Sequence, residues 1–228
     1  MNKILYLSFN GFSDYSGISK KKLAQIKGLK ECGCSVVNCH YTVNTEKKDR
    51  IWKVDDQVLH NLGVGIWAKV KKRIFFQPIV KYIQNQQIEM VYIRSEHNAN
   101  PFLIHFVRKL RKTGVKTVLE IPTYPYDQEY STFKSKCHLF IDKMFRKKLS
   151  NELEAIVTFS NEDLIFGKRT IRISNGIDFD LIRLSKKQLH NDELHMIGVA
   201  EIHYWHGFDR LIEGLGYYYN NKQGDYNI

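Results

Sequence analysis

Short apolar runs alternate with longer amphipathic stretches along most of this chain. Residues 3–9 form a compact run of β-branched and aromatic side chains that ends at Asn10-Gly11, which predicts a buried strand followed by a loop. Between residues 18 and 31, apolar side chains such as Leu23, Ile26 and Leu29 recur among lysines, which predicts a helix ended by Gly33. Similar apolar runs predict strands at 35–43, 59–64, 89–94, 116–121, 154–159, 170–174 and 194–200. Further amphipathic stretches predict helices at 66–85, 101–112, 131–149 and 207 to about 219.

Strand and helix thus alternate at the spacing of crossover connections. Proline is costly inside a helix, so we expect Pro78 to be the first residue of a second helix within 66–85. The alternation predicts an α/β fold, a Rossmann-like parallel sheet with helices on both faces. Ligands of such sheets bind at the carboxyl ends of the strands, near a topological switch point. The residues that directly follow each strand are therefore the candidates for function.

Composition places the chain among ordinary globular proteins. It has 228 residues, of which 43% are hydrophobic and 26% charged, enough for one domain or one and a half at about 100–200 residues per domain. No apolar run approaches the roughly 18 residues of a membrane span, and the first residues are too polar for a signal peptide, so we expect a cytoplasmic protein. The net charge of +11 is uneven, with +13 on residues 1–184 and −2 on residues 185–228.

The four cysteines do not form a disulfide framework. Cys32, Cys34 and Cys39 lie within eight positions of one another, and Cys137 is distant in sequence. Cys39 precedes a histidine, but the second half of a metal-ligand set is missing. We expect buried structural cysteines, no metal and no cofactor.

The loop after the first predicted strand is rich in glycine and serine and opens a helix. It has neither the G-x-G-x-x-G spacing nor the P-loop spacing. Free backbone N–H groups and the helix dipole still favour an anion near Ser16 and Gly17. The alternative is a polar loop in which Ser16 only caps the helix.

Two further post-strand segments carry candidate chemistry. Glu96 and His97 follow the strand predicted at 89–94 and could do acid–base or hydrogen-bonding work on a substrate. After the next strand, Glu120 precedes two prolines and two tyrosines, Tyr124 and Tyr126. Tyrosine and acid together suit sugar rings, by stacking and by accepting from hydroxyls. The alternative is a rigid turn that only closes the sheet.

Five segments, taken in order, resemble the GT-B glycosyltransferases, and among them the large retaining family 4 of bacterial polysaccharide synthesis. The first is the glycine loop. Residues 118–126 look like the acceptor-side motif, and residues 155–160 are similar to the last strand of the N-terminal domain. Residues 173–178 resemble the interdomain Asn-Gly-(Ile/Val)-Asp signature, and residues 197–212 resemble the opening strand and helix of the C-terminal domain.

This resemblance implies two Rossmann-like domains, the first for the acceptor and the second for a nucleotide-diphosphate sugar, with transfer that usually needs no metal. Residues 1–184 would be the acceptor-binding domain, and residues 185–228 the first strand and helix of an incomplete donor-binding domain. The implied roles are catalytic for His97 and Glu120, donor-phosphate-proximal for Ser16, Gly17, Asn175 and Gly176, and acceptor-binding for Glu96, Tyr124 and Tyr126.

The chain also departs from the family. The loop has one glycine where relatives often have a pair, and Glu201 and His206 occupy the places of the two cations that usually bind the diphosphate. The nucleotide-binding half of the second domain is absent from the sequence. We therefore expect that this chain alone does not transfer sugar.

The helices predicted at 66–83 and 131–149 mix lysine and arginine with aromatic residues. Such helices can lie on an anionic membrane surface, so peripheral membrane binding is a hypothesis, with solvated outer faces as the alternative. No nucleic-acid-binding pattern accompanies the basic charge, and we expect no nucleic acid partner. The exposed face of a half-domain also favours self-association. Two rival functions remain: a metal-dependent glycosyltransferase using Asp178 and Asp180, and a non-catalytic module that binds a partner chain or a membrane.

Overall fold

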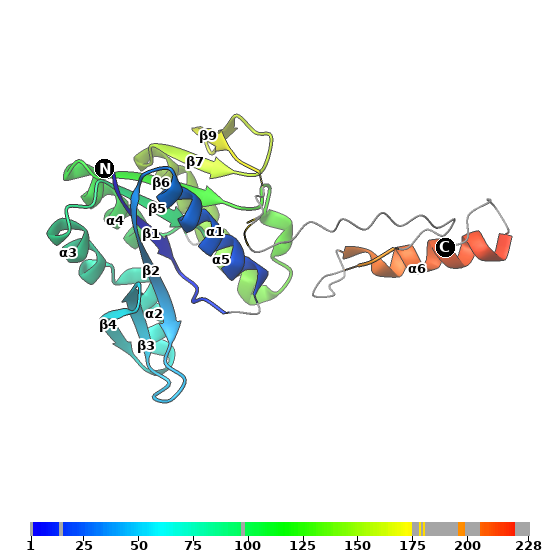
Figure 1. Ribbon diagram of the computed structural model, residues 1–228, viewed down its shortest axis with the longest axis horizontal. Coiled ribbons are helices and arrows are strands. Elements are labelled where there is room, and N and C mark those ends of the chain that lie inside the picture. Colours follow the sequence, from blue (N-terminus) through cyan, green and yellow to red (C-terminus); the bar gives the residue numbers. More distant parts are fainter. Residues whose placement is uncertain are drawn as a thin grey trace. The chain divides into compact units, whose positions relative to one another are not determined.

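The computed structural model describes residues 2–13, 16–96, 99–174, 178, 180, 196–198 and 206–221 (Figure 1). The chain divides into two compact units, Met1–Phe179 and Asp180–Ile228. In the second unit, the described part contains helix α6 (Phe208–Asn221), close to the helix predicted from Gly207. Of the strand predicted at 194–200, only residues 196–198 are described, and they belong to no helix or strand.

The first unit contains one sheet with the strand order β4-β3-β2-β1-β5-β6-β7-β9-β8. Its strands are β1 (Lys3–Ser8), β2 (Ser35–Val43), β3 (Arg50–Val54), β4 (Gln57–Gly63), β5 (Met90–Arg94), β6 (Lys116–Ile121), β7 (Ala155–Thr158), β8 (Leu164–Ile165) and β9 (Lys168–Arg172). Within this order, each strand of the series β2-β1-β5-β6-β7-β9 pairs in parallel with the next. This confirms the predicted Rossmann-like α/β class.

Both edges of the sheet are antiparallel, and this corrects the all-parallel expectation. At one edge, β3 pairs with β2 and β4 pairs with β3, both in antiparallel register. At the other edge, the two-residue β8 pairs antiparallel with β9. Neither β3 nor β8 was predicted, because Arg50 and Lys53 interrupt the apolar run of β3 and β8 is too short to show a pattern.

Five α-helices of the first unit connect or flank these strands: α1 (Gly17–Glu31), α2 (Gly65–Ile74), α3 (Gln77–Asn85), α4 (Pro101–Lys112) and α5 (Phe133–Glu152). Pro78 is the second residue of α3, so the predicted break in 66–85 is confirmed within one position. Helix α4 begins at Pro101, where the Asn100 side chain accepts hydrogen bonds from the N–H groups of Phe102 and Leu103 at 2.9 and 3.0 Å.

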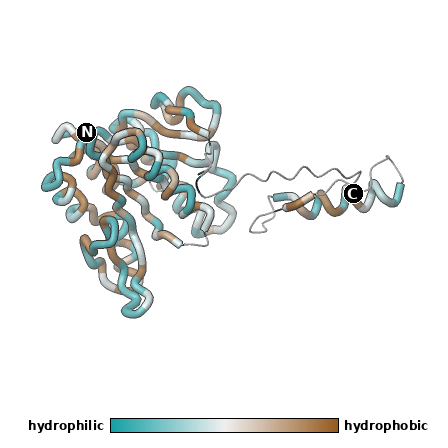
Figure 2. The backbone as a smooth tube through the Cα atoms, viewed as in Figure 1, coloured by the Kyte–Doolittle hydropathy of each residue, from teal (hydrophilic) through white to brown (hydrophobic). Residues whose placement is uncertain are grey.

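Helices cover both faces of the sheet, as predicted (Figure 1). Helix α1 packs on one face, where Ile26 joins a cluster with Ile4, Tyr6 and Val36. Helices α3, α4 and α5 contribute to the larger cluster on the other face, with buried side chains such as Leu103. Figure 2 shows the corresponding hydrophobic colour along the strands. Burial of these apolar side chains is the main stabilising term of the unit.

The expectation of buried cysteines is correct for Cys39 alone. Cys39 lies in β2 and is fully buried, whereas Cys34 is half-buried and Cys32 and Cys137 are exposed. Cys32 faces solvent because it is the C-cap at the end of α1, and Cys137 faces solvent because it lies on the outward face of α5. All four thiols are free.

Within the described ranges, no helix combines the length and apolar character that a membrane span requires.

Candidate functional site

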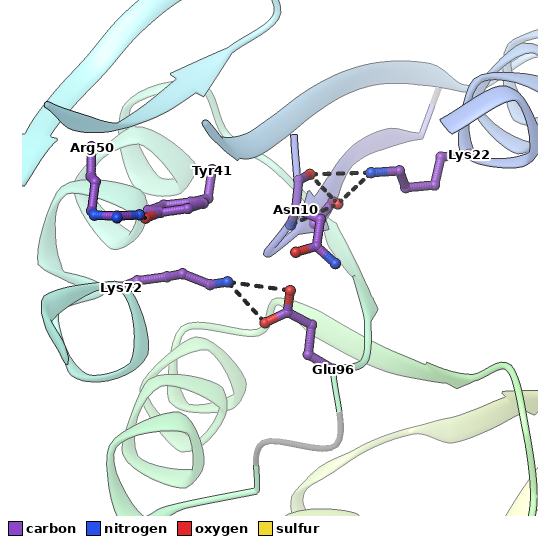
Figure 3. A network of polar contacts seen from close by, with 7 residues as sticks. Asn10, Lys22, Tyr41, Arg50, Lys72 and Glu96 are labelled. Atoms are coloured by element: carbon purple, nitrogen blue, oxygen red, sulfur yellow. Dashed lines mark hydrogen bonds and ion pairs between the residues drawn. The ribbon is translucent and has the colours of Figure 1, made fainter. Parts of the chain in front are cut away.

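The parallel sheet has one topological switch point, between β1 and β5. From β1 the chain first adds β2 on one side and later adds β5 on the other, so the loops after β1 and β5 leave the sheet in opposite directions. In folds of this kind, ligands bind at the carboxyl ends of the two strands that flank the switch point. Figure 3 shows the polar side chains that gather there, among them Lys22, Lys72 and Glu96. We call these three residues, with Lys21 and Arg94, the switch-point site.

Lys22 is a buried lysine that holds the loop after β1. Its side chain is 1% exposed, and its Nζ donates to Ser8 Oγ at 3.1 Å and to the backbone oxygens of Asn10 and Gly11 at 3.1 and 2.9 Å. A Cβ on Gly11 would lie 3.2 Å from Thr42 Oγ1, so the absence of a side chain lets this loop approach β2. The loop is thus clamped between β2 and α1.

Burial depresses the basicity of the two adjacent lysines of α1. It lowers the pKa of Lys22 to about 8, and the Arg94 charge acts in the same direction while Glu96 opposes it. Burial and Arg94 also lower the pKa of Lys21, whose ammonium lies 3.6 Å from the centroid of the Phe159 ring. These causes place both ammonium groups within electrostatic range of the end of β5.

Lys72 of α2 reaches the same region from the other side. Its Nζ lies 3.0 Å from Glu96 Oε2 and 3.2 Å from Oε1, and the two side chains are only 13% and 16% exposed (Figure 3). The ammonium also lies 4.6 Å from the centroid of the Tyr41 ring, whose hydroxyl accepts from Arg50. Burial lowers the pKa of Lys72, and the Glu96 carboxylate counteracts it. Glu96 is therefore a partly accessible carboxylate held in one place.

Glu120 belongs to a buried network behind this site. Its carboxylate accepts from Arg94 Nη1, from the Tyr92 hydroxyl at 2.9 Å and from Gln25 Nε2 at 3.1 Å. The Tyr6 ring stacks on Tyr92 at 5.1 Å, and its hydroxyl donates to Gln25 Oε1 at 2.7 Å. Glu120 is 0% exposed, and both its oxygens are bound within the protein. The catalytic role predicted for Glu120 stays a prediction. In this structure, the Glu120 carboxylate orients the Arg94 guanidinium.

Tyr126 is also tied down by its hydroxyl. It is 3% exposed and donates to Asp142 Oδ2 at 2.6 Å, while Asp142 Oδ1 accepts from the Ala99 N–H at 2.9 Å. Burial and the Asp142 charge raise the pKa of Tyr126. Tyr124 is half-buried, with its ring centroid 5.7 Å from that of Phe166. The acceptor-binding roles predicted for both tyrosines stay predictions, and in this structure Tyr126 anchors its loop to α5.

The remaining predicted residues divide into two groups. Ser16 is the N-cap of α1 and accepts from the Ser19 N–H at 3.4 Å, as its alternative interpretation required, and Gly17 is the exposed first residue of that helix. His97, Asn175 and Gly176 lie outside the described residues.

A metal site finds no support in the described part of the chain. No group of three or more His, Cys, Asp or Glu side chains there is placed to hold an ion. Asp178, one acid of the rival metal-dependent interpretation, accepts from Lys27 Nζ at 2.9 and 3.0 Å.

A hollow of about 440 Å³ lies at the opposite end of the sheet, at the amino ends of β1, β5 and β6. Its lining includes Ile4, Ile88 and Val115, with Glu89 and Lys116 as its charged residues. It lacks the convergence of cations and carboxylates at the switch point, so we place the candidate site at the carboxyl ends.

Sequence reasoning missed Lys22, Lys72 and Arg94 as site residues. Lys22 could have been found from its three- and four-residue spacing to Ser19 and Ile26, the other buried positions of α1. Arg94 could have been found from strand register, because Arg94 lies directly opposite Glu120 in the parallel pair β5–β6.

Comparison with known proteins adds no further constraint, since no family model, no curated protein and no solved structure matches this chain.

Proposed function

We propose that this chain is the acceptor-binding half of a glycosyltransferase. In full-length form, such an enzyme transfers a sugar from a nucleotide-diphosphate sugar to a hydroxyl of a carbohydrate or lipid-linked acceptor. The observation that carries the proposal is the switch-point site, which combines Lys21, Lys22 and Glu96 at the carboxyl ends of β1 and β5. The motif order that resembles family 4 glycosyltransferases supports the same function.

The charges of this site suit a phosphorylated carbohydrate. Arg94 is neutralised by Glu120, and Lys22 donates its three hydrogen bonds to the loop after β1. Lys21 therefore remains to bind a phosphate near the N-terminus of α1, and the buried charge of Lys22 adds to the attraction. Glu96 supplies a carboxylate that can accept from sugar hydroxyls when they replace the ammonium of Lys72. Sugar and phosphate groups of one acceptor could therefore be held at once.

Donor binding belongs to a second domain in the enzymes that this sequence resembles. We therefore propose that the 228-residue chain binds acceptor without transferring sugar by itself. Turnover of a nucleotide sugar by the purified chain, with a lipid-linked acceptor added, would contradict this part of the proposal.

Acceptor binding can be tested by calorimetric titration with N-acetylglucosamine diphospho-farnesol, with inorganic diphosphate and UDP-N-acetylglucosamine as reference ligands. We expect the glycosyl diphosphate to bind more tightly than inorganic diphosphate. The variants Lys21→Met and Glu96→Gln should each weaken it about tenfold, the loss of one charged contact of about 1.4 kcal/mol.

Matched controls are Lys30→Met and Glu162→Gln, which alter exposed residues elsewhere. They should leave the affinity unchanged. Equal affinity for the glycosyl diphosphate and inorganic diphosphate would mean that the site binds anions without recognising the sugar. An equal loss of affinity in the site and control variants would contradict the proposed location of the site.

A further inference from the structure

Helix α5 turns a long apolar stripe toward solvent. Its inward face holds Leu139, Asp142, Leu149 and Ser150, all buried. On the opposite face, apolar side chains recur at three- and four-residue spacing, as on one side of a helix. They are Phe133, Phe140, Ile141 and Met144, which are 85%, 65%, 45% and 54% exposed, together with exposed Cys137. The sheet is therefore covered by one face of α5, and a second apolar face remains open.

Lysines border this stripe on both sides. At 100° per residue, Lys136, Lys143 and Lys147 lie along one border and Lys134 along the other, with Lys148 near the C-terminal end of the stripe. Lys143 binds Asp127 at 2.9 Å, whereas Lys134, Lys136 and Lys147 form no ion pair with the described residues. Of the two acids of the helix, Asp142 is on the buried face, and Glu152, its last residue, pairs with Arg108 and Arg111 of α4.

Helix α2, which like α5 packs against α4, repeats this arrangement. Only Ala68 of α2 is buried, and Ile66 and Trp67 are 76% and 77% exposed. Exposed Lys69 and Lys71 flank them. Burial lowers the pKa of His138 in the first half of α5, and the charge of Arg73 at the end of α2 lowers it further. The end of α2 is therefore within electrostatic range of α5.

We infer that the exposed faces of α5 and α2 dock on an anionic lipid bilayer. Lysine borders match the charge of acidic headgroups, and an outward apolar stripe on a helix enters the headgroup–acyl boundary to about 5–10 Å. Trp67 belongs to the residue type that prefers this boundary. Each helix exposes apolar side chains between lysines, and this pairing of apolar and cationic groups is the chemistry that an anionic bilayer surface accepts. This inference is independent of the proposed sugar chemistry.

Vesicle flotation tests the inference with the full chain and no sugar. Phosphatidylcholine vesicles with 30% phosphatidylglycerol should carry the protein at low salt and release much of it at high salt, and pure phosphatidylcholine vesicles should carry little. Lys134→Gln, Lys136→Gln and Lys147→Gln combined should weaken binding about 100-fold, since each lysine contributes about 1 kcal/mol. Replacing Phe140, Ile141 and Met144 by serine should abolish flotation.

Control variants carry the same changes elsewhere. Lys30→Gln, Lys47→Gln and Lys116→Gln combined remove the same charge from other exposed positions, and Leu164→Ser removes an exposed apolar residue of β8. Circular dichroism confirms that each variant folds. A vesicle-induced blue shift of tryptophan fluorescence, lost in Trp67→Phe, would assign the contact to α2.

Three results would overturn the inference. The first is no flotation with acidic vesicles. The second is equal loss in the α5 and control variants, which would mean a non-specific effect of net charge. The third is a change of oligomeric mass in the serine variant without vesicle binding by the original chain, which would assign the stripe to a second copy of the protein.

Discussion

At the scale of single residues, Lys22 carries an unusual combination of full burial and positive charge. Three oxygen atoms accept from its ammonium, and none of them belongs to a carboxylate. Hydrogen bonds without a counter-charge compensate only part of the desolvation cost of an ammonium. This explains why burial is the largest cause of its lowered pKa.

The stability of the protein should therefore depend on pH through Lys22. Its pKa of about 8 in the folded chain lies below the ordinary value of 10.5, so the unfolded chain binds more protons between these values. The free energy of unfolding should rise with pH across this window, by about 2 kcal/mol from pH 7 to pH 9.5 for this group. Urea denaturation at the two pH values should show a larger rise in the original chain than in Lys22→Met, in which Lys21 and Lys72 still contribute to the rise because their pKa values are also lowered.

Lys30→Met is the matched control, because Lys30 is an exposed lysine of the same helix. It should keep the full rise, and both variants should be compared below pH 10, where the unfolded chain's tyrosines are still protonated. The same rise in Lys22→Met as in the original chain would show that Lys22 titrates normally.

Lys22 also shows where prediction from the sequence stops at this scale. The apolar pattern of residues 18–31 favours Leu23 as a core residue, yet Leu23 is 52% exposed and Lys22 is buried. The cause is the loop after β1, whose backbone oxygens need a donor and face α1 only after the chain has folded. The pattern of apolar and polar residues along the chain does not show that these backbone oxygens need a donor.

At the scale of elements, α5 holds two loops of the carboxyl edge through one side chain. Asp142 binds the Tyr126 hydroxyl in the loop after β6 and the Ala99 N–H in the segment before α4. Beside Tyr126 and Asp142 lies a cavity of about 10 Å³, room for about one water molecule. The two loops are thus positioned by one buried carboxylate of a helix that is otherwise rich in lysine and arginine.

Tyr126→Phe should destabilise the protein by about 1.5–3 kcal/mol, because a buried hydrogen bond to a charged carboxylate is lost. Equilibrium denaturation measures this loss, and hydrogen exchange should show faster exchange in residues 122–130. Tyr124→Phe is the control from the same loop and should change stability by less than about 0.5 kcal/mol. Equal effects of the two substitutions would contradict the anchoring role of Tyr126.

Elements were predictable where pairing is parallel and burial is deep. Strand β6 and helix α4 have the predicted bounds, since β6 lies buried between two parallel neighbours and a proline starts α4. Strand β3 was not predictable because Arg50 and Lys53 interrupt its apolar residues, and the edge strand β8 was not predictable because two residues show no pattern. The same limit applies to Asp142 of α5, which was visible in the sequence but whose inward orientation was not.

At the scale of the whole molecule, the fold class determines the position of the candidate site, but not its groups. An alternating pattern implies a parallel sheet, and a parallel sheet implies a site at its carboxyl edge. The expected positions therefore include Glu96, which the structure brings to the switch point. The cations opposite it come from α1 and α2, and no spacing rule connects those helices to a strand end.

The first unit should be stable without the second. Its three buried clusters and the hydrophobic residues packed against them all lie between Ile4 and Ile173, and Asp178 is held by Lys27 of the same unit. A chain shortened to residues 1–179 should therefore unfold cooperatively, with a midpoint within about 4 °C of the full chain, which corresponds to about 1 kcal/mol at this size.

Thermal denaturation followed by circular dichroism measures the midpoint, and the fluorescence of buried Trp52 reports on the core. A chain ending at residue 153 is the negative control, because it lacks β7, a strand whose four residues are all buried. A midpoint lowered by more than about 10 °C in the 1–179 chain, or a gradual transition, would mean that residues 180–228 stabilise the sheet.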